Sequence, residues 1–486
     1  MNIPNLRILP EDTLILVIDE AMDVLEKVGF FVENDEALTL LGDNGIRINK
    51  KTQRAYCPRW RTEEILTQPP GSIAFYDREG KHSFILKEDT LVFTPGSAAL
   101  NILDYESMKI RPPQTPDARI FHCLIQKLDY IKAQSTALIY NDVPGEIQDS
   151  YRLYHALLYC SKPIVTGTFR KESFSVMKDL LSAVRGSEEN LREKPLAIFD
   201  ACPSPPLKWS DLTAQSIIDC ARSGIPSEFV SMPMAGATSP VTLKDVLVQH
   251  TAETISGILI SQSVFPGAPV IYGGSPSVLD MRHGTTPMGA IETMLIACGF
   301  AQVGKYFGFP THAYMGLSDS KQTDYQAGLE SGIGIILATL SGINMVAGAG
   351  MLNFESCQSF EKLLLDNEIC GMAYRLQKGI TLQEETSAAV LLKRLISTGD
   401  FLSDPHTLKW FREELFLPGN TIDRSILYAN EIKPGMSAVD RAHRSIADIM
   451  KLTKDAFITD CSQQLYKIME KEAKRWGFYI EMNNYT

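Results

Sequence analysis

The sequence lacks several patterns that mark common classes of protein. Its 47 lysines and arginines form no basic blocks and are outnumbered by 58 aspartates and glutamates, giving a formal net charge of −11. An acidic chain of this kind argues against binding to nucleic acid or to an anionic membrane surface. The nine cysteines are scattered and include no CxxC pair, so neither a disulfide framework nor a zinc knuckle is expected. A reducing cytoplasm is the predicted compartment.

Motifs of metal-dependent and nucleophilic enzymes are missing as well. The eight histidines form neither HxH nor HExxH, so we expect this chain to hold no metal ion. There is no GxSxG elbow to present a nucleophilic serine. Cys202 ends a candidate strand, and we interpret it as a packed rather than a catalytic cysteine. The chemistry, if there is any, is therefore expected to come from carboxylates and aromatic residues.

The sequence has no clear membrane or export signal. The first 30 residues carry acids within their apolar stretch and have no basic start, unlike a signal peptide. The uncharged stretch 331–354 is longer than the roughly 20 residues that a bilayer requires. It is interrupted by Ser341 and Gly342 and flanked by acids, so we predict a buried helix, a turn and a buried parallel strand.

A short apolar run followed by a helical stretch recurs from about residue 90. The candidate strands are 90–97, 136–142, 162–169, 196–203, 227–236, 268–277, 311–319 and 343–351. The candidate helices are 116–131, 147–159, 173–184, 212–223, 243–264, 289–306, 323–340 and 359–378. Strands that alternate with helices form βαβ units and a parallel sheet.

The number of units predicts the fold class α/β and a (β/α)₈ TIM barrel. A doubly wound open sheet is the main alternative, but its phosphate-binding GxGxxG is absent from that context. We assign residues 90–379 to a catalytic barrel and residues 1–89 to an extension with a helix and a β-hairpin. Residues 380–486 are expected to form a C-terminal helical region.

Functional residues of such barrels lie at the C-terminal ends of the strands. The polar cluster that follows 311–317 lies at one of these ends, and it makes Asp319 and Gln326 candidate catalytic residues together with Tyr272. The alternative is that Ser318 or Asp319 only caps the next helix. Other carboxylates that could take part are Asp142, Asp200, Asp280, Asp324 and Glu330.

Aromatic residues occur at or just past several strand ends. They are Tyr140, Phe169, Tyr272, Tyr314 and Phe354. A ring of aromatic faces suits a cationic ligand through cation–π attraction. The alternative is that these side chains fill the core of the barrel. The sequence alone leaves both readings open.

Several long motifs resemble the trimethylamine methyltransferase family. They are "MPMAGATSPVTL" (232–243), "HTAETISGILISQ" (250–262), "GAPVIYGGSPSVLDMRHG" (267–284), "DSKQTDYQAGLESG" (319–332) and "GAGMLNF…EKLLLDNEICGM" (348–372). The similarity covers most of the chain. It implies a (β/α)₈ barrel that transfers a methyl group from a methylamine to the Co(I) of a corrinoid on a separate protein.

One departure from the family pattern narrows the expected substrate. The founding members carry pyrrolysine in the barrel, whereas this chain has only standard residues. The resemblance is thus to the branch that acts on quaternary amines such as glycine betaine. A quaternary ammonium leaves as a neutral amine and needs no general acid, so the protein would mainly position the substrate and exclude water.

The resemblance also implies binding partners. Arg282 and His283 are the expected anchors for a betaine carboxylate, unless Arg282 pairs with Asp280 instead. The only near match to the cobalamin signature DxHxxG, residues 404–409, lacks the glycine, so the corrinoid is expected on a partner protein and not on this chain. We expect a homo-oligomer. A barrel lyase or decarboxylase that uses the rim carboxylates and a non-catalytic betaine-binding protein remain alternatives.

Overall fold

The computed structural model describes residues 5–382, 387–426, 437–452 and 461–480. Eight parallel strands form one sheet in the order β6-β18-β17-β15-β13-β11-β10-β9. The two end strands meet at bridges between Phe93 and Ile131 and between Ala99 and Leu138, and the Lys132 N–H donates to the Phe93 carbonyl across this seam at 3.0 Å. The sheet is a nearly closed barrel, which confirms the predicted fold and excludes the open doubly wound sheet.

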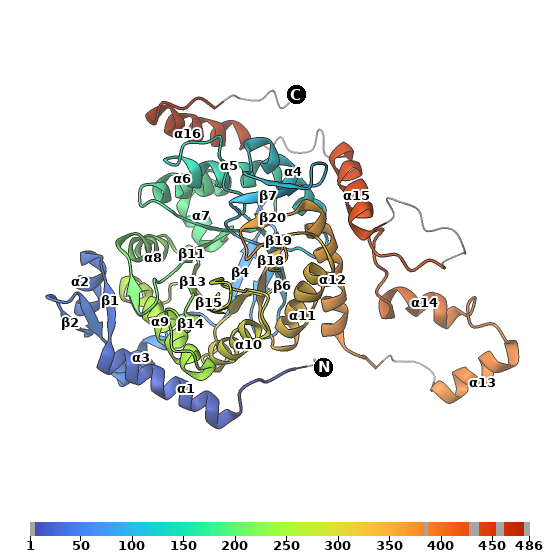
Figure 1. Ribbon diagram of the computed structural model, residues 1–486, viewed down its shortest axis with the longest axis horizontal. Coiled ribbons are helices and arrows are strands. Elements are labelled where there is room, and N and C mark those ends of the chain that lie inside the picture. Colours follow the sequence, from blue (N-terminus) through green and yellow to red (C-terminus); the bar gives the residue numbers. More distant parts are fainter. Residues whose placement is uncertain (1–4, 383–386, 427–436, 453–460, 481–486) are drawn as a thin grey trace.

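The predicted order of strands and helices is also confirmed. The strands are β6 (Val92–Pro95), β9 (Gln134–Ser135), β10 (Ile164–Gly167), β11 (Ala197–Ala201), β13 (Ser227–Ser231), β15 (Val270–Gly274), β17 (Thr311–Tyr314) and β18 (Met345–Ala349). The helices that follow them are α4 (Thr115–Lys127), α5 (Gln148–Tyr159), α6 (Ser173–Arg185) with the short α7 (Glu188–Glu193), α8 (Asp211–Ser223), α9 (Leu243–Val264), α10 (Ile291–Tyr306), α11 (Tyr325–Leu340) and α12 (Phe360–Lys378). They surround the strands in Figure 1.

One strand is displaced from its predicted place. The run 136–142 was expected to be a strand, but β9 ends at Ser135. The Thr136 N–H still donates to the Val165 carbonyl of β10 at 3.0 Å. From Ala137 the chain pairs with Ala99, because the Ala99 N–H donates to the Ala137 carbonyl and the Ile139 N–H donates to the Ala99 carbonyl. Residues after 139 therefore leave the barrel wall.

The stretch 331–354 is confirmed as a buried helix, a turn and a strand. It comprises most of α11, a turn at Ser341 and Gly342, and β18. Helix α11 is capped by Asp324, whose carboxylate accepts the Ala327 N–H at 3.0 Å. The helix cap is thus Asp324 and not Ser318 or Asp319. In the parts of the chain that the structure describes, no helix combines the length and the apolar character needed to cross a bilayer.

A β-hairpin closes the N-terminal end of the barrel. Strands β4 (Ile73–Tyr76) and β5 (His82–Leu86) pair in antiparallel fashion. Their buried residues Ile73, Phe75, Phe84 and Leu86 pack against side chains near the starts of the barrel strands, namely Val92, Ala133, Val165, Ile198, Ile271 and Met345. Because this end is filled, a cavity inside the barrel has to open at the other end.

The remaining elements surround the barrel. On the N-terminal side are α1 (Glu11–Asp23), a π-helical turn (Val24–Val28), β1 (Phe30–Val32), α2 (Asp35–Asp43), β2 (Arg47–Asn49), β3 (Arg54–Tyr56) and α3 (Arg59–Leu66), and β1 pairs with β12 (Lys208–Trp209). After β6 and β18 the chain adds a small sheet of β7 (Asn101–Asp104), β8 (Lys109–Arg111), β19 (Met351–Leu352) and β20 (Cys357–Gln358). Strands β14 (Met234–Ala235) and β16 (Ser277–Val278) pair with each other.

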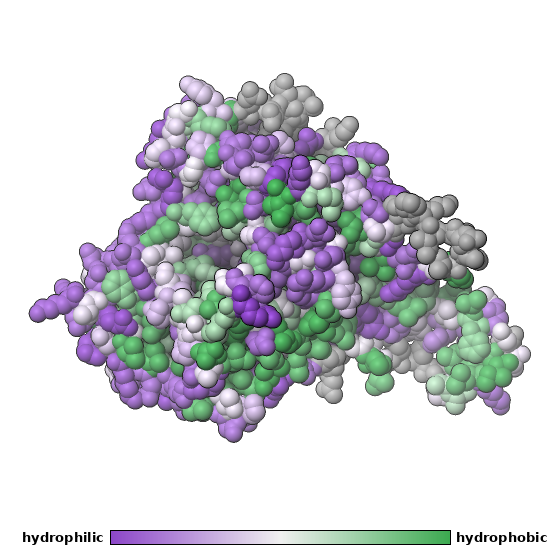
Figure 2. Space-filling view, in the orientation of Figure 1, coloured by the Kyte–Doolittle hydropathy of each residue, from purple (hydrophilic) through white to green (hydrophobic). Residues whose placement is uncertain are grey.

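The C-terminal region contains α13 (Ala388–Thr398), α14 (Pro405–Glu414), α15 (Ala438–Leu452) and α16 (Ser462–Arg475). Helices α15 and α16 pack against the barrel helices, whereas α13 projects away from the barrel (Figure 1). The projecting part exposes apolar side chains, including Val390, Ile396 and Leu402 (Figure 2). Surfaces of this kind are typical of protein contacts. The homo-oligomer and the domain boundaries at residues 89 and 379 stay predictions.

The closing hairpin generates a stability prediction. Phe75 is fully buried and its ring centroid lies 5.2 Å from that of Phe84. Phe75→Ala should lower the free energy of unfolding by about 3–5 kcal/mol, because it leaves a cavity in the seal of the barrel. Urea unfolding would measure the loss, and Trp60→Ala, at a side chain that is 64% exposed, should cost less than about 0.5 kcal/mol. Equal small losses for both variants would show that the hairpin does not seal the barrel.

Candidate active site

A cavity of about 410 Å³ lies at the C-terminal ends of the barrel strands. It is lined by residues from β10, β11, β13 and β17, from the loops after β6, β9, β15 and β18, and from α5 and α8. The lining side chains that carry charge or a polar group include Ser97, Thr136, Arg152, Thr166, Asp200, Cys202, Ser275, Tyr314 and Glu355. This is the end at which barrels of this class carry function, and the volume is within the usual range for a small-molecule site.

Ionisable side chains fill the barrel beneath this cavity. The carboxyl groups of Asp200 and Glu228 occupy neighbouring positions on β11 and β13, and the imidazole of His312 on β17 contacts Glu228. Glu228 and His312 are completely buried. Gly273 on β15 makes room for them, since a Cβ at that position would lie 3.0 Å from the Glu228 side chain. The centre of the barrel is therefore polar by construction rather than filled with apolar side chains.

The surroundings of this cluster keep it close to neutral. Burial raises the pKa of Asp200 well above its ordinary value, and the nearby Glu228 raises it further. Burial likewise raises the pKa of Glu228 and lowers the pKa of His312 to about 4. Because a dry site disfavours charge, the cluster retains protons that exposed carboxyl groups would lose. Groups of this kind mark candidate functional sites.

A third carboxyl group of the site comes from the turn between β19 and β20 and lines the cavity. Glu355 Oε1 accepts from the Ser97 hydroxyl at 3.4 Å, and the Tyr314 hydroxyl lies 3.1 Å from the Ser97 Oγ. Burial is the main cause that raises the pKa of Glu355 to about 8, and Asp200 adds to it. Ser97, Tyr314 and Glu355 thus form one hydrogen-bonded edge of the cavity.

The loop that carries Glu355 has an unusual backbone. Asn353, Phe354 and Glu355 are consecutive and all have left-handed φ values, of 51°, 56° and 65°. Non-glycine residues in this region cost on the order of 1–3 kcal/mol each and gather at functional sites. The Asn353 side chain holds the turn by donating to Ser356 Oγ at 2.7 Å. The strain brings Phe354 and Glu355 to the cavity.

Three of the predicted aromatic residues line this cavity: Phe169, Tyr314 and Phe354. The Lys321 ammonium lies 4.0 Å from the Phe354 ring centroid and the Arg152 guanidinium lies 5.4 Å from that of Phe169. A cation of the protein itself thus sits near each phenylalanine ring. Their contact with a ligand stays a prediction.

Two predicted aromatic residues lie outside the cavity. Tyr272 points between the helices, where its hydroxyl lies 3.2 Å from Thr251 Oγ1 and its ring stacks with Phe309. Tyr140 lies beyond the end of β9 and packs against Tyr151 and His155. Side chains alternate across a strand, so Ile271 points into the barrel and Tyr272 away from it. Both rings are buried, but they pack against helices outside the barrel, so they neither line the cavity nor fill the interior of the barrel.

The predicted basic anchors also lie away from the cavity. Arg282 is 82% exposed and donates to both carboxylate oxygens of Asp280, at 3.0 Å and 2.8 Å. His283 Nδ1 lies 3.2 Å from the same carboxylate. The alternative stated from the sequence, an Arg282–Asp280 pair, is the one that the structure shows. Neither residue lines the cavity.

The polar cluster at Asp319 supports the rim. The Asp319 carboxylate accepts the N–H groups of Met288 at 2.8 Å and Gly289 at 2.9 Å, which fastens the loop after β15. Glu330 accepts the Asp319 N–H at 2.8 Å, and Gln326 donates to Glu330 at 2.9 Å. Burial raises the pKa of Asp319 to about 6. Asp319 and Gln326 thus belong to a hydrogen-bonded network that supports the loop beside the cavity, and they do not line the cavity.

Several residues of the cavity wall and of the buried cluster beneath it were not predicted as site residues. Glu228, His312, Glu355 and Arg152 escaped notice, and Asp200 was named only among possible rim carboxylates. The signal for two of them was present, because Glu228 and His312 are ionisable residues inside otherwise apolar strands. Arg152 comes from a helix, so it is not found by searching the C-terminal ends of the strands for functional residues.

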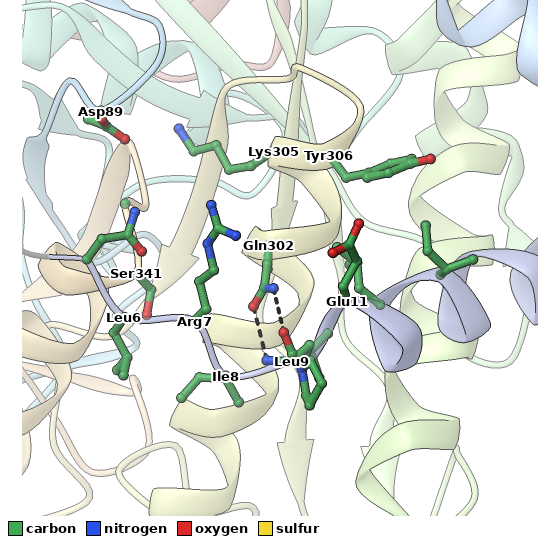
Figure 3. Close-up of a pocket in the computed structure, with 15 residues that line it drawn as sticks. Leu6, Arg7, Ile8, Leu9, Glu11, Asp89, Gln302, Lys305, Tyr306 and Ser341 are labelled. Atoms are coloured by element: carbon green, nitrogen blue, oxygen red, sulfur yellow. Dashed lines mark hydrogen bonds between the residues drawn. The ribbon is translucent and has the colours of Figure 1, made fainter.

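A larger cavity, of about 650 Å³, lies at the opposite end of the molecule (Figure 3). It lies between the N-terminal segment and α10, and the Gln302 amide holds that segment by exchanging hydrogen bonds with the Leu9 backbone at 3.1 Å and 2.8 Å. Asp89 and Gly342, which precede β6 and β18, also line it. Features at this end of a barrel usually serve stability.

Comparison with known proteins identifies the family. The profile of the family described as trimethylamine methyltransferase (MTTB) matches residues 1–474. The chain belongs to the trimethylamine methyltransferase family. It is 30% identical over 420 residues to trimethylamine methyltransferase MttB of Desulfitobacterium hafniense (strain DSM 10664 / DCB-2), covering 86% of this chain and 84% of that protein.

A second relative carries a different name. The glycine betaine methyltransferase of Desulfitobacterium hafniense (strain Y51) is 28% identical over 443 residues, which cover 91% of each chain. The crystal structure of the monomethylamine methyltransferase of Methanosarcina barkeri covers 97% of this chain and 95% of its own, at 10% identity and a TM-score of 0.47. That structural likeness is too distant to bear on the site of this trimethylamine methyltransferase family member.

The described residues of this family member show no cluster of three or more His, Cys, Asp or Glu side chains that could hold a metal ion. The near match to the cobalamin signature also does not fit a corrinoid. Asp404 caps α14 by accepting the His406 N–H at 2.8 Å and pairs with Arg394 at 2.7 Å. A helix start with its carboxylate so engaged is not the strand-to-loop setting of that signature.

Glu355 generates a prediction about pH and stability. Its folded pKa of about 8 lies above the ordinary 4.5, so its contribution to stability is full below about pH 4.5 and lost as the pH rises through about 8. Glu355→Gln removes this loss. The stability of the variant relative to the wild type should therefore rise between about pH 5 and pH 9, by roughly 1.4 kcal/mol for each unit of pKa displacement.

Urea unfolding across this pH range would measure the difference. Glu26→Gln, at an exposed position, serves as the matched control for replacing a glutamate with a glutamine. A stability difference for Glu355→Gln that does not change with pH would show that the pKa of Glu355 is not raised in the folded protein.

Proposed function

We propose that this protein transfers a methyl group from a quaternary amine, with glycine betaine as the first candidate, to the Co(I) corrinoid of a separate protein. Membership of the family and the relative named as a glycine betaine methyltransferase support a methylated amine as donor. The absence of pyrrolysine from the sequence favours a donor that is already cationic.

The observation that carries the proposal is the composition of the cavity wall. Phe169, Tyr314 and Phe354 offer aromatic surface, and Asp200 and Glu355 offer negative charge when they ionise. Aromatic faces and carboxylates together suit a trimethylammonium group, which has no N–H with which to donate a hydrogen bond. Each aromatic contact contributes on the order of 0.5–2 kcal/mol.

The chemistry asks little of the protein beyond position and dryness. When a nucleophile takes a methyl group from a quaternary ammonium, the C–N bond breaks, its electron pair stays on nitrogen, and a neutral tertiary amine leaves. No proton has to be supplied. The residues of this chain would hold the donor with one methyl group toward the open end of the cavity and keep water away from it. The corrinoid, carried by the partner, would supply the nucleophilic cobalt.

One observation favours a second candidate function. Asp200, Glu228 and His312 form a buried cluster of groups that could act as general acids and bases in a lyase or decarboxylase. A lyase of this kind would act without a corrinoid protein. This difference separates the two functions in one experiment.

The test is a methyl-transfer assay with a Co(I) corrinoid protein and glycine betaine. We expect dimethylglycine and methylated corrinoid in equal amounts, and no reaction when the corrinoid protein is omitted. Above about pH 8, where Glu355 ionises, Glu355→Gln should lower kcat/KM about tenfold or more, since it removes the negative charge that faces the donor. Consumption of substrate without corrinoid would favour the lyase, and binding without any turnover would favour a binding protein.

A further inference from the structure

Arg152 is a buried cation on the wall of the cavity. It comes from α5, its side chain is almost fully enclosed at 3% exposure, and it lies beneath the exposed ring of Phe169. Arginine is rarely buried to this degree unless its charge is paired. The charge of Arg152 therefore needs an explanation.

The protein provides hydrogen-bond acceptors for only some of the N–H donors of the Arg152 guanidinium. Its Nη2 donates to the backbone carbonyls of Thr136 and, at 3.2 Å, of Ser97. Its Nε is buried and has no hydrogen-bond partner among the described residues. Within that same part of the chain the guanidinium forms no ion pair, although Asp149 and Asp200 lie near enough to influence it. A buried charge without a counter-ion is strongly destabilising.

The two nearby carboxyl groups are poor counter-ions. Asp149 accepts the Phe169 N–H at 2.8 Å with one oxygen, while its other oxygen has no partner among the described residues. Burial raises the pKa of both Asp149 and Asp200, which leaves them less ready to ionise. The positive charge of Arg152 is thus only weakly compensated, and it borders a cavity that a ligand can enter.

We propose that Arg152 binds the carboxylate of a zwitterionic methyl donor whose trimethylammonium end faces Phe354, Tyr314 and Glu355. This inference rests on the proposed function and narrows it to donors that carry both charges. The donor supplies the anion that Arg152 lacks, and the guanidinium can grip a carboxylate through parallel N–H donors. Arg152 is thus placed to do what the exposed, already paired Arg282 was expected to do.

The charge of Arg152 also selects against simpler donors. A cation without a carboxylate would enter a cavity that already contains a positive charge and would gain no contact with it. A zwitterion presents no net charge and satisfies both ends of the cavity. The same residue therefore attracts betaines and disfavours tetramethylammonium, which is specificity by attraction and repulsion together.

Three probes separate the two ends of the site. Glycine betaine carries both charges, tetramethylammonium carries only the cation, and 3,3-dimethylbutanoate has the shape and carboxylate of glycine betaine with carbon in place of nitrogen. Their affinities for the full-length protein can be measured by calorimetry without any corrinoid protein. We expect 3,3-dimethylbutanoate to compete with glycine betaine for the wild-type protein.

The decisive variant is Arg152→Met, which keeps an unbranched side chain and removes the charge. This variant should lower the affinity for glycine betaine and for 3,3-dimethylbutanoate by about ten- to hundredfold. Tetramethylammonium should bind equally well or more tightly, because a repulsive charge is gone. Arg152→Lys should fall between Arg152→Met and the wild type, since a lysine keeps the charge but not the paired donors.

A second buried arginine provides the matched control. Arg185, 9% exposed, donates to the backbone carbonyls of Tyr76 at 2.9 Å and Lys194 at 2.8 Å, outside the cavity. Arg185→Met should reduce thermal stability and leave all three affinities unchanged. This control separates loss of a buried arginine in general from loss of an anion site.

The outcomes bear on the two proposals separately. The role of Arg152 would be overturned if Arg152→Met lowered the affinity for all three probes equally. It would also be overturned if Arg282→Ala, and not Arg152→Met, selectively lowered the affinity for the two carboxylates. A wild-type protein that binds tetramethylammonium more tightly than glycine betaine would overturn it as well, a result that needs no variant. The proposed methyl transfer would fall only if no quaternary amine donates a methyl group in the corrinoid assay.

Discussion

The burial of ionisable groups at the centre of the barrel is the constraint on which the rest of the site depends. Glu228 and His312 are fully enclosed where a barrel of this kind usually packs branched apolar side chains, and Arg152 is almost fully enclosed on the wall of the cavity. Charges in such a place are costly unless they are neutralised or paired. The site reduces the cost by retaining protons on its carboxyl groups, and an entering zwitterion would reduce it further.

Other parts of the fold serve this arrangement. The β4–β5 hairpin fills the N-terminal end with aromatic and aliphatic side chains, so the polar cluster is closed off at that end. Gly273 leaves space for the Glu228 side chain. The left-handed turn at 353–355 brings Glu355 over the opening, and Asp319 ties down the neighbouring loop. The closed N-terminal end, Gly273 and the left-handed turn thus all support the same cavity.

The architecture could be predicted from the sequence, because alternation of apolar runs and helical stretches is a repeated signal and errors in single elements do not change the count. The site was harder to predict. A residue at the end of a strand points inward or outward according to its place in the alternation, and a shift of one residue separates Ile271 from Tyr272. Arg152 comes from a helix, so the rule that function lies at strand ends does not identify it. The pairing of Arg282 with Asp280 depends on the conformation of their loop. Glu228 and His312, by contrast, could have been found by asking why an acid and a histidine interrupt apolar strands.

The proposed site places a quaternary amine with a carboxylate in the cavity at the C-terminal end of the barrel. A crystal structure of the protein soaked with glycine betaine tests this most directly. We predict density in the cavity lined by Asp200 and Tyr314, with the trimethylammonium end toward Phe354 and Glu355 and the carboxylate at the Arg152 guanidinium. Glycine betaine bound at the rim beside Arg282, or with its carboxylate toward Glu355, would contradict it.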